Sequence, residues 1–234
     1  MMKRLVIFSG AGMSAESGLK TFRDSGGLWE EYNIEEVATP EAWKANPGRV
    51  LNFYNLRRKQ VINATPNAGH FALVRLEELF HVDVITQNID DLHERAGSSN
   101  VLHLHGEVMK SRAQNDPTQT YPVHGDLNLG DLNEEGAQLR PHVVWFGEEV
   151  PAMAHAIEVM RRANVVLIVG TSLNVYPAAS LIHYAPKHIQ FFVVDPNEMQ
   201  APKLKNLRII RANASKGIPL LVDELMAQPA VKQS

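Results

Sequence analysis

Short apolar runs alternate along the chain with longer stretches of helical periodicity. The runs that are almost continuously apolar are residues 5–8, 82–86, 101–104, 165–169, 191–194 and 207–210. Such runs are typical of parallel strands that are covered by helices on both faces. Helix starts are marked between them by a capping residue before proline at Thr39-Pro40 and Thr65-Pro66, and Pro151 marks another. The alternation predicts an α/β fold with a doubly wound parallel sheet.

Two stretches interrupt this alternation. Residues 30–62 show a helical pattern with aromatic residues and no strand, whereas residues 111–140 are rich in Asn, Asp, Gly and Pro. A loop of that length without secondary structure would be unusual in a compact domain. We therefore expect a smaller inserted lobe made of residues 30–62 and 107–142. The Rossmann-like nucleotide-binding domain around it would comprise residues 1–29, 63–106 and 143–234, with the site where the two lobes meet.

Composition narrows the class of protein. With 44% hydrophobic and 21% charged residues, the 234-residue chain is too apolar for disorder and too polar for a membrane protein. The net charge of −3 gives no electrostatic reason to expect a nucleic-acid partner. The first apolar run is too short for a signal peptide or a spanning helix, so we expect a cytoplasmic protein. The absence of cysteine excludes disulfides, thiolate zinc sites and a cysteine nucleophile.

A glycine-rich segment follows the first predicted strand. Residues 10–15, Gly-Ala-Gly-Met-Ser-Ala, match the pattern G-x-G-x-x-G/A, which allows a backbone to approach a pyrophosphate at a helix N-terminus. A tight strand–helix turn would give the same pattern. The acidic residue that ends the second strand of dinucleotide-binding dehydrogenases is missing, and the sequence of residues 21–29 predicts a loop with an arginine instead. This departure argues against a simple hydride-transfer enzyme.

Polar side chains follow the next two predicted strands. Asn88 and Asp90 come just past the strand at 82–86, where the reactive part of a cofactor would lie, although either could simply cap a helix. His103 and His105 lie on the same face of a strand, a spacing that a metal site could use, but no third ligand is obvious. A histidine at a strand end is often only structural. If it is functional, a general base is the simpler interpretation, because imidazole titrates near neutral pH.

Several segments together resemble one family. They read Gly-Ala-Gly-Met-Ser-Ala-Glu-Ser-Gly (10–18), Thr-Phe-Arg (21–23), Thr-Gln-Asn-Ile-Asp (86–90), His-Leu-His-Gly (103–106), Pro-His-Val-Val-Trp-Phe-Gly-Glu (141–148) and Gly-Thr-Ser (170–172). In this order, and over nearly the whole chain, they resemble the sirtuins, the NAD-dependent protein-lysine deacylases. Tyr54 and Arg57 also form the Tyr-x-x-Arg pair of bacterial sirtuins of the desuccinylating class.

The resemblance implies an activity and a role for each matching residue. The chain would remove acyl groups from protein lysines, giving nicotinamide and 2′-O-acyl-ADP-ribose, with His105 as general base. Asn88 would order the ribose and water, and Asp90 would hold the nicotinamide carboxamide. The NAD-binding residues would be Gly10, Ala11, Gly12, Glu16, Phe22, Arg23, Gln87, Asn88, Ile89, Asp90, Gly170, Thr171, Ser172, Asp195 and Ala214. The substrate-binding residues would be Tyr54, Arg57, Val144, Phe146, Gly147 and Glu148, the last four in a segment that pairs with an extended acyl-lysine peptide.

A physical argument favours acidic acyl groups such as succinyl, with acetyl also accepted. Stripping a succinyl carboxylate of water costs several kcal/mol. Tyr54 and Arg57 share a helix face and could offset that cost with charge-assisted hydrogen bonds of about 1.5–3 kcal/mol each. The alternative is that Arg57, Arg58 and Lys59 form a solvated basic face.

One departure from the family concerns metal. Most sirtuins hold a structural zinc with four cysteines, whereas the matching stretch here, from Lys110 onward, has none. The resemblance therefore implies NAD but no zinc, and a small lobe held by packing and turns. Two other functions stay open: an ADP-ribosyltransferase or NAD glycohydrolase using the same cleft, and a non-catalytic module that binds NAD or acyl-lysine.

Overall fold

The computed structural model describes residues 2–20, 32–197 and 204–227. In this part of the chain the larger sheet is parallel throughout and has the strand order β3-β2-β1-β7-β8-β9. Its strands are β1 (Lys3–Ser9), β2 (Phe80–Thr86), β3 (Val101–His103), β7 (Val165–Val169), β8 (Gln190–Val194) and β9 (Leu207–Ile210). From β1 the strands are added toward one edge of the sheet (β2, β3), and from β7 they are added toward the other edge (β8, β9). This change of direction between β1 and β7 makes the sheet doubly wound. The predicted fold class is confirmed, and each predicted strand region forms a strand.

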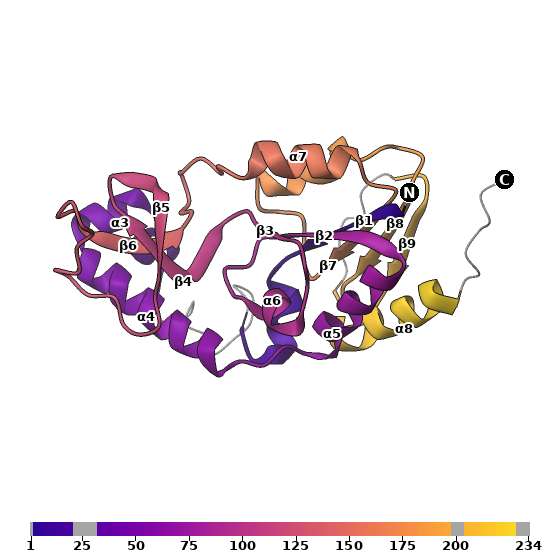
Figure 1. Ribbon diagram of the computed structural model, residues 1–234, viewed down its shortest axis with the longest axis horizontal. Helices are drawn as coiled ribbons and strands as arrows, with labels where there is room; N and C mark the ends of the chain where they lie inside the picture. Colours follow the sequence, from indigo (N-terminus) through magenta and orange to yellow (C-terminus); the bar gives the residue numbers. More distant parts are fainter. Residues whose placement is uncertain (1, 21–31, 198–203, 228–234) are drawn as a thin grey trace.

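Both faces of this sheet are buried, as β1 illustrates. Leu5 and Ile7 belong to one apolar core, whereas Val6 and Phe8 belong to the other, and all four side chains are fully buried. The first core is covered by α5 (Ala68–Arg75) and α8 (Ala214–Ala227), and the second by α7 (Met153–Arg161) and the 3-10 helix η4 (Ala178–Tyr184). Figure 1 shows α7 on one side of the strands and α5 and α8 on the other. Successive side chains of a strand point to opposite faces, so two apolar layers require a continuous apolar run.

A smaller antiparallel sheet lies at the other end of the molecule (Figure 1). It consists of β4 (Gly106–Ala113), β5 (Asp116–Pro122) and β6 (Leu139–Val143), in the order β5-β4-β6. The helices α2 (Ile34–Val37), α3 (Pro40–Ala45) and α4 (Pro47–Asn63) contribute to an apolar cluster that also includes Val108 and Val143 of this sheet. The stretch 111–140, which shows little periodicity in sequence, therefore forms much of a sheet.

The predicted helix starts have different outcomes. Thr39 caps α3 as expected, because its hydroxyl accepts a hydrogen bond from the Ala42 N–H at 3.0 Å. The start at Thr65-Pro66 is wrong: α5 begins at Ala68, where Asn67 and His70 form a reciprocal capping box. α7 likewise begins at Met153 and not at Pro151. None of the helices in the described parts of the chain has the length and apolar character needed to cross a membrane.

A buried arginine ties the helical part of the small lobe to its sheet. Arg58 of α4 is 1% exposed; its Nε donates to the Val108 carbonyl at 2.8 Å, and its Nη1 donates to Asn55 Oδ1 at 2.7 Å and to the Gly125 carbonyl at 3.2 Å. The Asn55 side-chain amide in turn donates through Nδ2 to the Leu127 carbonyl at 3.0 Å and accepts the Leu127 N–H on Oδ1 at 2.9 Å. These contacts join α4 to β4 and to residues 125–127, in the stretch that the resemblance matches to the zinc-binding part of sirtuins.

We expect Arg58→Ala to destabilise the protein by about 3 kcal/mol, because it leaves buried carbonyl groups without donors and opens a cavity. The measurement is the free energy of unfolding in denaturant. Lys59→Ala is the matched control, since that neighbouring side chain is 58% exposed and should change stability by less than about 0.5 kcal/mol. Equal effects of the two substitutions would contradict the role given to Arg58.

Candidate functional site

Three loops meet at the carboxyl edge of the large sheet, around the point where the strand order reverses. The loop after β1 contacts the turn after β7: the Gly10 N–H donates to the Val169 carbonyl at 3.0 Å, and the Gly12 N–H donates to the Gly170 carbonyl at 2.9 Å. A Cβ atom on Gly12 would lie 2.7 Å from Gly170 Cα, and one on Gly170 would lie 2.2 Å from Met13 N. The glycines are therefore needed because two backbones touch here.

In the described residues up to Lys20, no α-helix follows this glycine loop. Two short 3-10 helices form there instead, η1 (Ala11–Met13) inside the pattern and η2 (Ala15–Ser17) at its end, so the helix-dipole reason for phosphate binding does not apply. The loop is held from α5 instead. Asn67 Nδ2 donates to the Met13 carbonyl at 2.9 Å and to Ser17 Oγ at 3.1 Å.

The segment after β2 places Asn88 and Asp90 beside the glycine loop. Asn88 is 7% exposed and donates through Nδ2 to Ser14 Oγ at 3.1 Å. Asp90 is 5% exposed and accepts the Leu92 N–H at 3.2 Å, at the start of α6 (Leu92–Ala96). Burial raises the pKa of Asp90, while the Leu92 N–H, the Ser14 hydroxyl and nearby positive charges oppose that rise. Asp90 thus serves at the helix start and also lies in the polar cluster at the sheet edge.

Two histidines anchor this same segment through its backbone. His105 Nδ1 lies 3.1 Å from the Gln87 carbonyl oxygen, and His103 Nδ1 lies 2.9 Å from the Asn88 carbonyl oxygen. Both rings thus contact the segment 87–88, but only His103 lies in β3 (Val101–His103), and His105 follows the end of that strand. Burial lowers the pKa of His105, which the Gln87 carbonyl only partly opposes. At neutral pH the His105 imidazole is uncharged, with its proton on Nδ1 and a lone pair on Nε2.

Tyr54 and Arg57 of α4 act electrostatically on the same region. Tyr54 is 3% exposed, and burial raises the pKa of its hydroxyl, which therefore stays protonated. Burial lowers the pKa of Arg57, while Asp90 and Tyr54 oppose that shift. Arg57 Nη1 also donates to Gln60 Oε1 at 3.2 Å. A solvated basic face describes Lys59, but it does not describe the partly buried Arg57.

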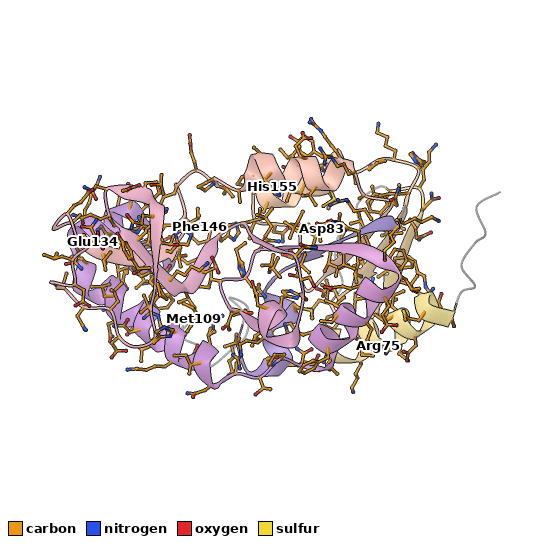
Figure 2. All side chains as sticks on the ribbon, viewed as in Figure 1. Arg75, Asp83, Met109, Glu134, Phe146 and His155 are labelled. Atoms are coloured by element: carbon orange, nitrogen blue, oxygen red, sulfur yellow. The ribbon has the colours of Figure 1, made fainter. Side chains whose placement is uncertain are left out.

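The segment after β6 is a turn whose backbone is largely engaged within the protein. The Val144 N–H donates to the His105 carbonyl at 2.9 Å, and the Phe146 N–H donates to the Ala38 carbonyl at 3.0 Å. Phe146 is 46% exposed and lies between the smaller sheet and α7 (Figure 2).

Glu148 holds this turn together. It accepts the Trp145 N–H at 2.8 Å and pairs with Arg140 Nη1 at 2.7 Å, and the Arg140 guanidinium stacks 3.2 Å above the Trp145 ring. Gly147 has φ +90°, which a side chain would strain.

The remaining predicted cofactor residues divide into two groups. Thr171 joins the site, since its hydroxyl accepts a hydrogen bond from Gln87 Nε2 at 3.1 Å. Ile89 packs with the small-lobe cluster, and Ser172 follows Thr171 in the turn after β7. Phe22 and Arg23 lie outside the described residues.

The second group lies around α8 and the end of β8. The Glu16 carboxylate accepts the N–H and hydroxyl of Ser215, at 2.9 and 2.7 Å, at the first turn of α8, where Ala214 is buried. Asp195 follows β8 and accepts the Asn197 N–H at 2.9 Å. In the described part of the chain, the hydrogen bonds of Glu16 and Asp195 thus lead to Ser215 and Asn197 and not to the cluster around Asn88.

Sequence reasoning missed two residues of this region, Ser14 and Glu94. Ser14 lies inside the glycine pattern as an unspecified position, so the pattern itself gave no signal for it. Glu94 contacts His103 at 2.7 Å, and only the packing of α6 against β3 brings the two together. Among the described residues, Glu94, His103 and Glu107 form a group of possible metal ligands within 4.8 Å of one another. Each already has a charged partner, because Glu107 pairs with Lys110 at 2.7 Å.

Comparison with known proteins places this arrangement in a family. A family model described as the Sir2 family matches residues 10–177. The chain belongs to the Sir2 family. The predicted resemblance to sirtuins is thereby confirmed.

Relatives and solved structures agree with this membership. A protein of Helicobacter pylori J99 named NAD-dependent protein deacylase is 52% identical over 225 residues, covering 96% of each chain. One of Bacteroides thetaiotaomicron with the same name is 47% identical over 234 residues, covering 97% of this chain and all of the other. A Sir2 homolog–NAD complex superposes with a TM-score of 0.86 at 38% identity, over 96% and 90% of the two chains. A Sir2–p53 peptide–NAD+ complex gives 0.80 at 28% identity, over 96% and 94%.

Proposed function

We propose that this Sir2-family protein removes acyl groups from protein lysines at the expense of NAD, preferring acidic acyl groups such as succinyl and also accepting acetyl. The products would be free lysine, nicotinamide and 2′-O-acyl-ADP-ribose. The NAD-dependent deacylase activity rests on the family and on relatives of about 50% identity that carry this name. The acyl preference rests on one observation, the partly buried Arg57 whose charge acts on Tyr54 and Asp90.

The side chains at the sheet edge fit NAD. Ser14 and Thr171 offer hydroxyls, Asn88 and Gln87 offer amides, and Asp90 offers a carboxylate, which together suit ribose hydroxyls and a carboxamide. They come from the loops after β1, β2 and β7, where ligands of doubly wound sheets bind. NAD, when bound, supplies the ribosyl group that accepts the acyl group.

His105 is the proposed general base. Its Nδ1–H is fixed on the Gln87 carbonyl at 3.1 Å, which leaves Nε2 as the atom that takes a proton from a ribose hydroxyl. Because burial lowers the pKa of His105, the ring is neutral and able to accept this proton at pH 7. Asn88 would order the ribose and the attacking water, and Asp90 would hold the carboxamide of nicotinamide.

Arg57 and Tyr54 form the proposed acyl-carboxylate pocket. Tyr54 remains a hydrogen-bond donor because burial keeps its hydroxyl protonated. Arg57 contributes a guanidinium that stays cationic, and Gln60 holds it at 3.2 Å. An acetyl group lacks the carboxylate and would occupy the same space without these bonds. These residues belong to the smaller lobe, for which residues 30–62 and 107–142 remain the proposed boundaries.

Residues 144–148 are the proposed contact for an extended acyl-lysine peptide. The Sir2 neighbour with a p53 peptide supports peptide binding by this fold. The N–H groups of Val144, Trp145 and Phe146 are donated within the protein. A peptide that pairs here would therefore donate its own N–H groups to carbonyl oxygens of the segment.

The test is an assay with purified protein, NAD and two peptides that differ only in an acetyl or a succinyl group on the same lysine. We expect nicotinamide and free lysine peptide to form together, only when a peptide is present, and with a higher kcat/KM for succinyl. Nicotinamide release at the same rate without peptide would indicate an NAD glycohydrolase instead. A higher kcat/KM for acetyl would contradict only the acyl preference.

A further inference from the structure

His103 lies between two hydrogen-bond acceptors. Its Nδ1 is 2.9 Å from the Asn88 carbonyl oxygen, and its Nε2 is 2.7 Å from Glu94 Oε1, with the side chain 8% exposed. A neutral imidazole has a single N–H group and can donate to only one of them, whereas an imidazolium donates to both. The contacts of His103 therefore require the charged ring.

The charged groups around His103 favour this state. Glu94 approaches from α6 and Glu107 from β4, where Lys110 pairs with Glu107 at 2.7 Å. The charge of His103 also acts on Asp90 and His93. Burial alone would lower the pKa of His103, but Glu94, with help from the Asn88 carbonyl and Glu107, outweighs burial and raises that pKa.

His93 does not compete for the proton. Burial and the charges of His70 and His103 lower its pKa well below the ordinary value, so His93 stays neutral. The positive charges of this region are therefore those of His103, of Lys110 and of Arg57, whose charge also acts on Asp90.

His105 provides the contrast. Both histidines anchor Nδ1 on a carbonyl of the same segment, Gln87 for His105 and Asn88 for His103. The Glu94 carboxylate faces Nε2 of His103 and raises the pKa of that ring. The pKa of His105, in contrast, is set by burial and by its hydrogen bond to the Gln87 carbonyl. One ring is thus suited to act as a base and the other to act as a fixed cation.

We propose that Glu94 and His103 form a positioning pair that orients Asn88 and places a positive charge beside Asp90 for binding of the nicotinamide end of NAD. This inference rests on the proposed function, which gives Asn88 and Asp90 their roles. Asn88 is then held at three atoms: its backbone N–H donates to Thr86 Oγ1 at 3.1 Å, its side-chain Nδ2 donates to Ser14 Oγ at 3.1 Å, and its backbone carbonyl accepts from His103 Nδ1 at 2.9 Å. The charge of His103 also lowers the pKa of Asp90 against the effect of burial, which favours the carboxylate form.

The variants Glu94→Gln and His103→Gln remove the positive charge at position 103 while keeping side chains of similar size. A glutamine at position 94 can donate to the Nε2 of a neutral His103, so the ring keeps its place while the charge is lost. For both variants we expect the KM for NAD to rise about tenfold at neutral pH, with kcat changed by less than about threefold. His81→Gln is the matched control, because His81 pairs with Asp83 at 3.4 Å on β2 but is 46% exposed and lies away from the carboxyl edge.

The pH profile distinguishes positioning from a structural role. In the wild-type protein the KM for NAD should stay low below the raised pKa of His103 and increase as the pH passes above it. Glu94→Gln should move that increase to lower pH. The acidic side of the profile belongs to kcat, which should fall as the pH drops through the lowered pKa of His105. Histidine NMR titration provides the direct measurement, with His103 expected to titrate above 6.5.

Two results would overturn the proposal. The first is a KM for NAD in both variants that stays within about twofold of the His81→Gln control at every pH. The second is an NMR titration of His103 at or below 6.5, which excludes the cation whether or not the protein is active. If the wild-type protein shows no NAD-dependent deacylation, the proposed function fails, and the NMR titration still decides the charge of His103.

Discussion

Deacylation by the His105→Ala variant is expected to be slower than by the wild-type protein by a factor of about 10²–10⁴ in kcat. The substitution removes the neutral Nε2 that would accept a proton. The other imidazole of this strand region, His103, is engaged by Glu94 at 2.7 Å and cannot replace it. The measurement is the rate of formation of free lysine peptide at saturating NAD and peptide.

The fold should survive this substitution, because the contact from the Val144 N–H is to the backbone carbonyl of residue 105 and is retained. NAD affinity should therefore change by less than about threefold. His155→Ala, on the exposed face of α7 (Figure 2), is the matched control and should behave as wild type. A His105→Ala protein with wild-type kcat would remove His105 from the mechanism.

Arg57→Met is expected to lower kcat/KM for a succinyl-lysine peptide by a factor of about 10–100, and for the acetyl peptide by less than about threefold. The reason is the loss of charge-assisted hydrogen bonds of about 1.5–3 kcal/mol from a site that still removes water from the carboxylate. Methionine retains most of the apolar side-chain volume, so the packing of α4 should persist. The ratio of the two kcat/KM values is the quantity to measure.

Arg49→Met is the control for this prediction. Arg49 lies on the same helix and carries the same charge, but its side chain is 42% exposed and pairs with Glu36 at 2.7 Å. Its substitution should leave the acyl preference unchanged. Equal losses on both peptides in Arg57→Met would show that Arg57 supports the fold or the cofactor and does not choose the acyl group.

The large sheet was predictable because each of its strands carries its own signal, a short run of apolar residues. A strand covered on both faces must be apolar at every position, and that signal is visible in a short window of sequence. The edge strand β5 (Asp116–Pro122) gives no such signal, since most of its side chains are exposed and it contains two prolines. Nothing in residues 111–140 therefore indicated a sheet.

Helix boundaries show the limit of local patterns. Thr39 and Thr65 both precede proline, yet only Thr39 caps a helix. At the second position Asn67 provides the cap, because His70 lies three residues further on and completes the capping box. Thr65 and Asn67 are both suitable capping residues, and what selects Asn67 is its partner His70.

The candidate site divides in the same way. Asn88, Asp90 and His105 could be found from sequence, because each follows a strand end and the family motifs contain them. Ser14 and Glu94 could not, since their partners are Asn88 and His103 and these contacts form only when the loops and α6 pack together. Glycine spacing was recognised, but its physical cause is the contact of Gly12 with Gly170.

Because Arg58 holds the small lobe together, the lobe depends neither on a metal ion bound by thiolates nor on reduced thiols. Where four thiolates hold a zinc ion, the lobe is complete only after a metal has been delivered, and it is exposed to oxidants that attack sulfur. Here the chain has no cysteine, and a guanidinium that is part of the polypeptide donates to carbonyl groups of β4 and of residues 125–127. This lobe can thus fold without binding a zinc ion at thiolates, and its stability is independent of the thiol redox state of the cell.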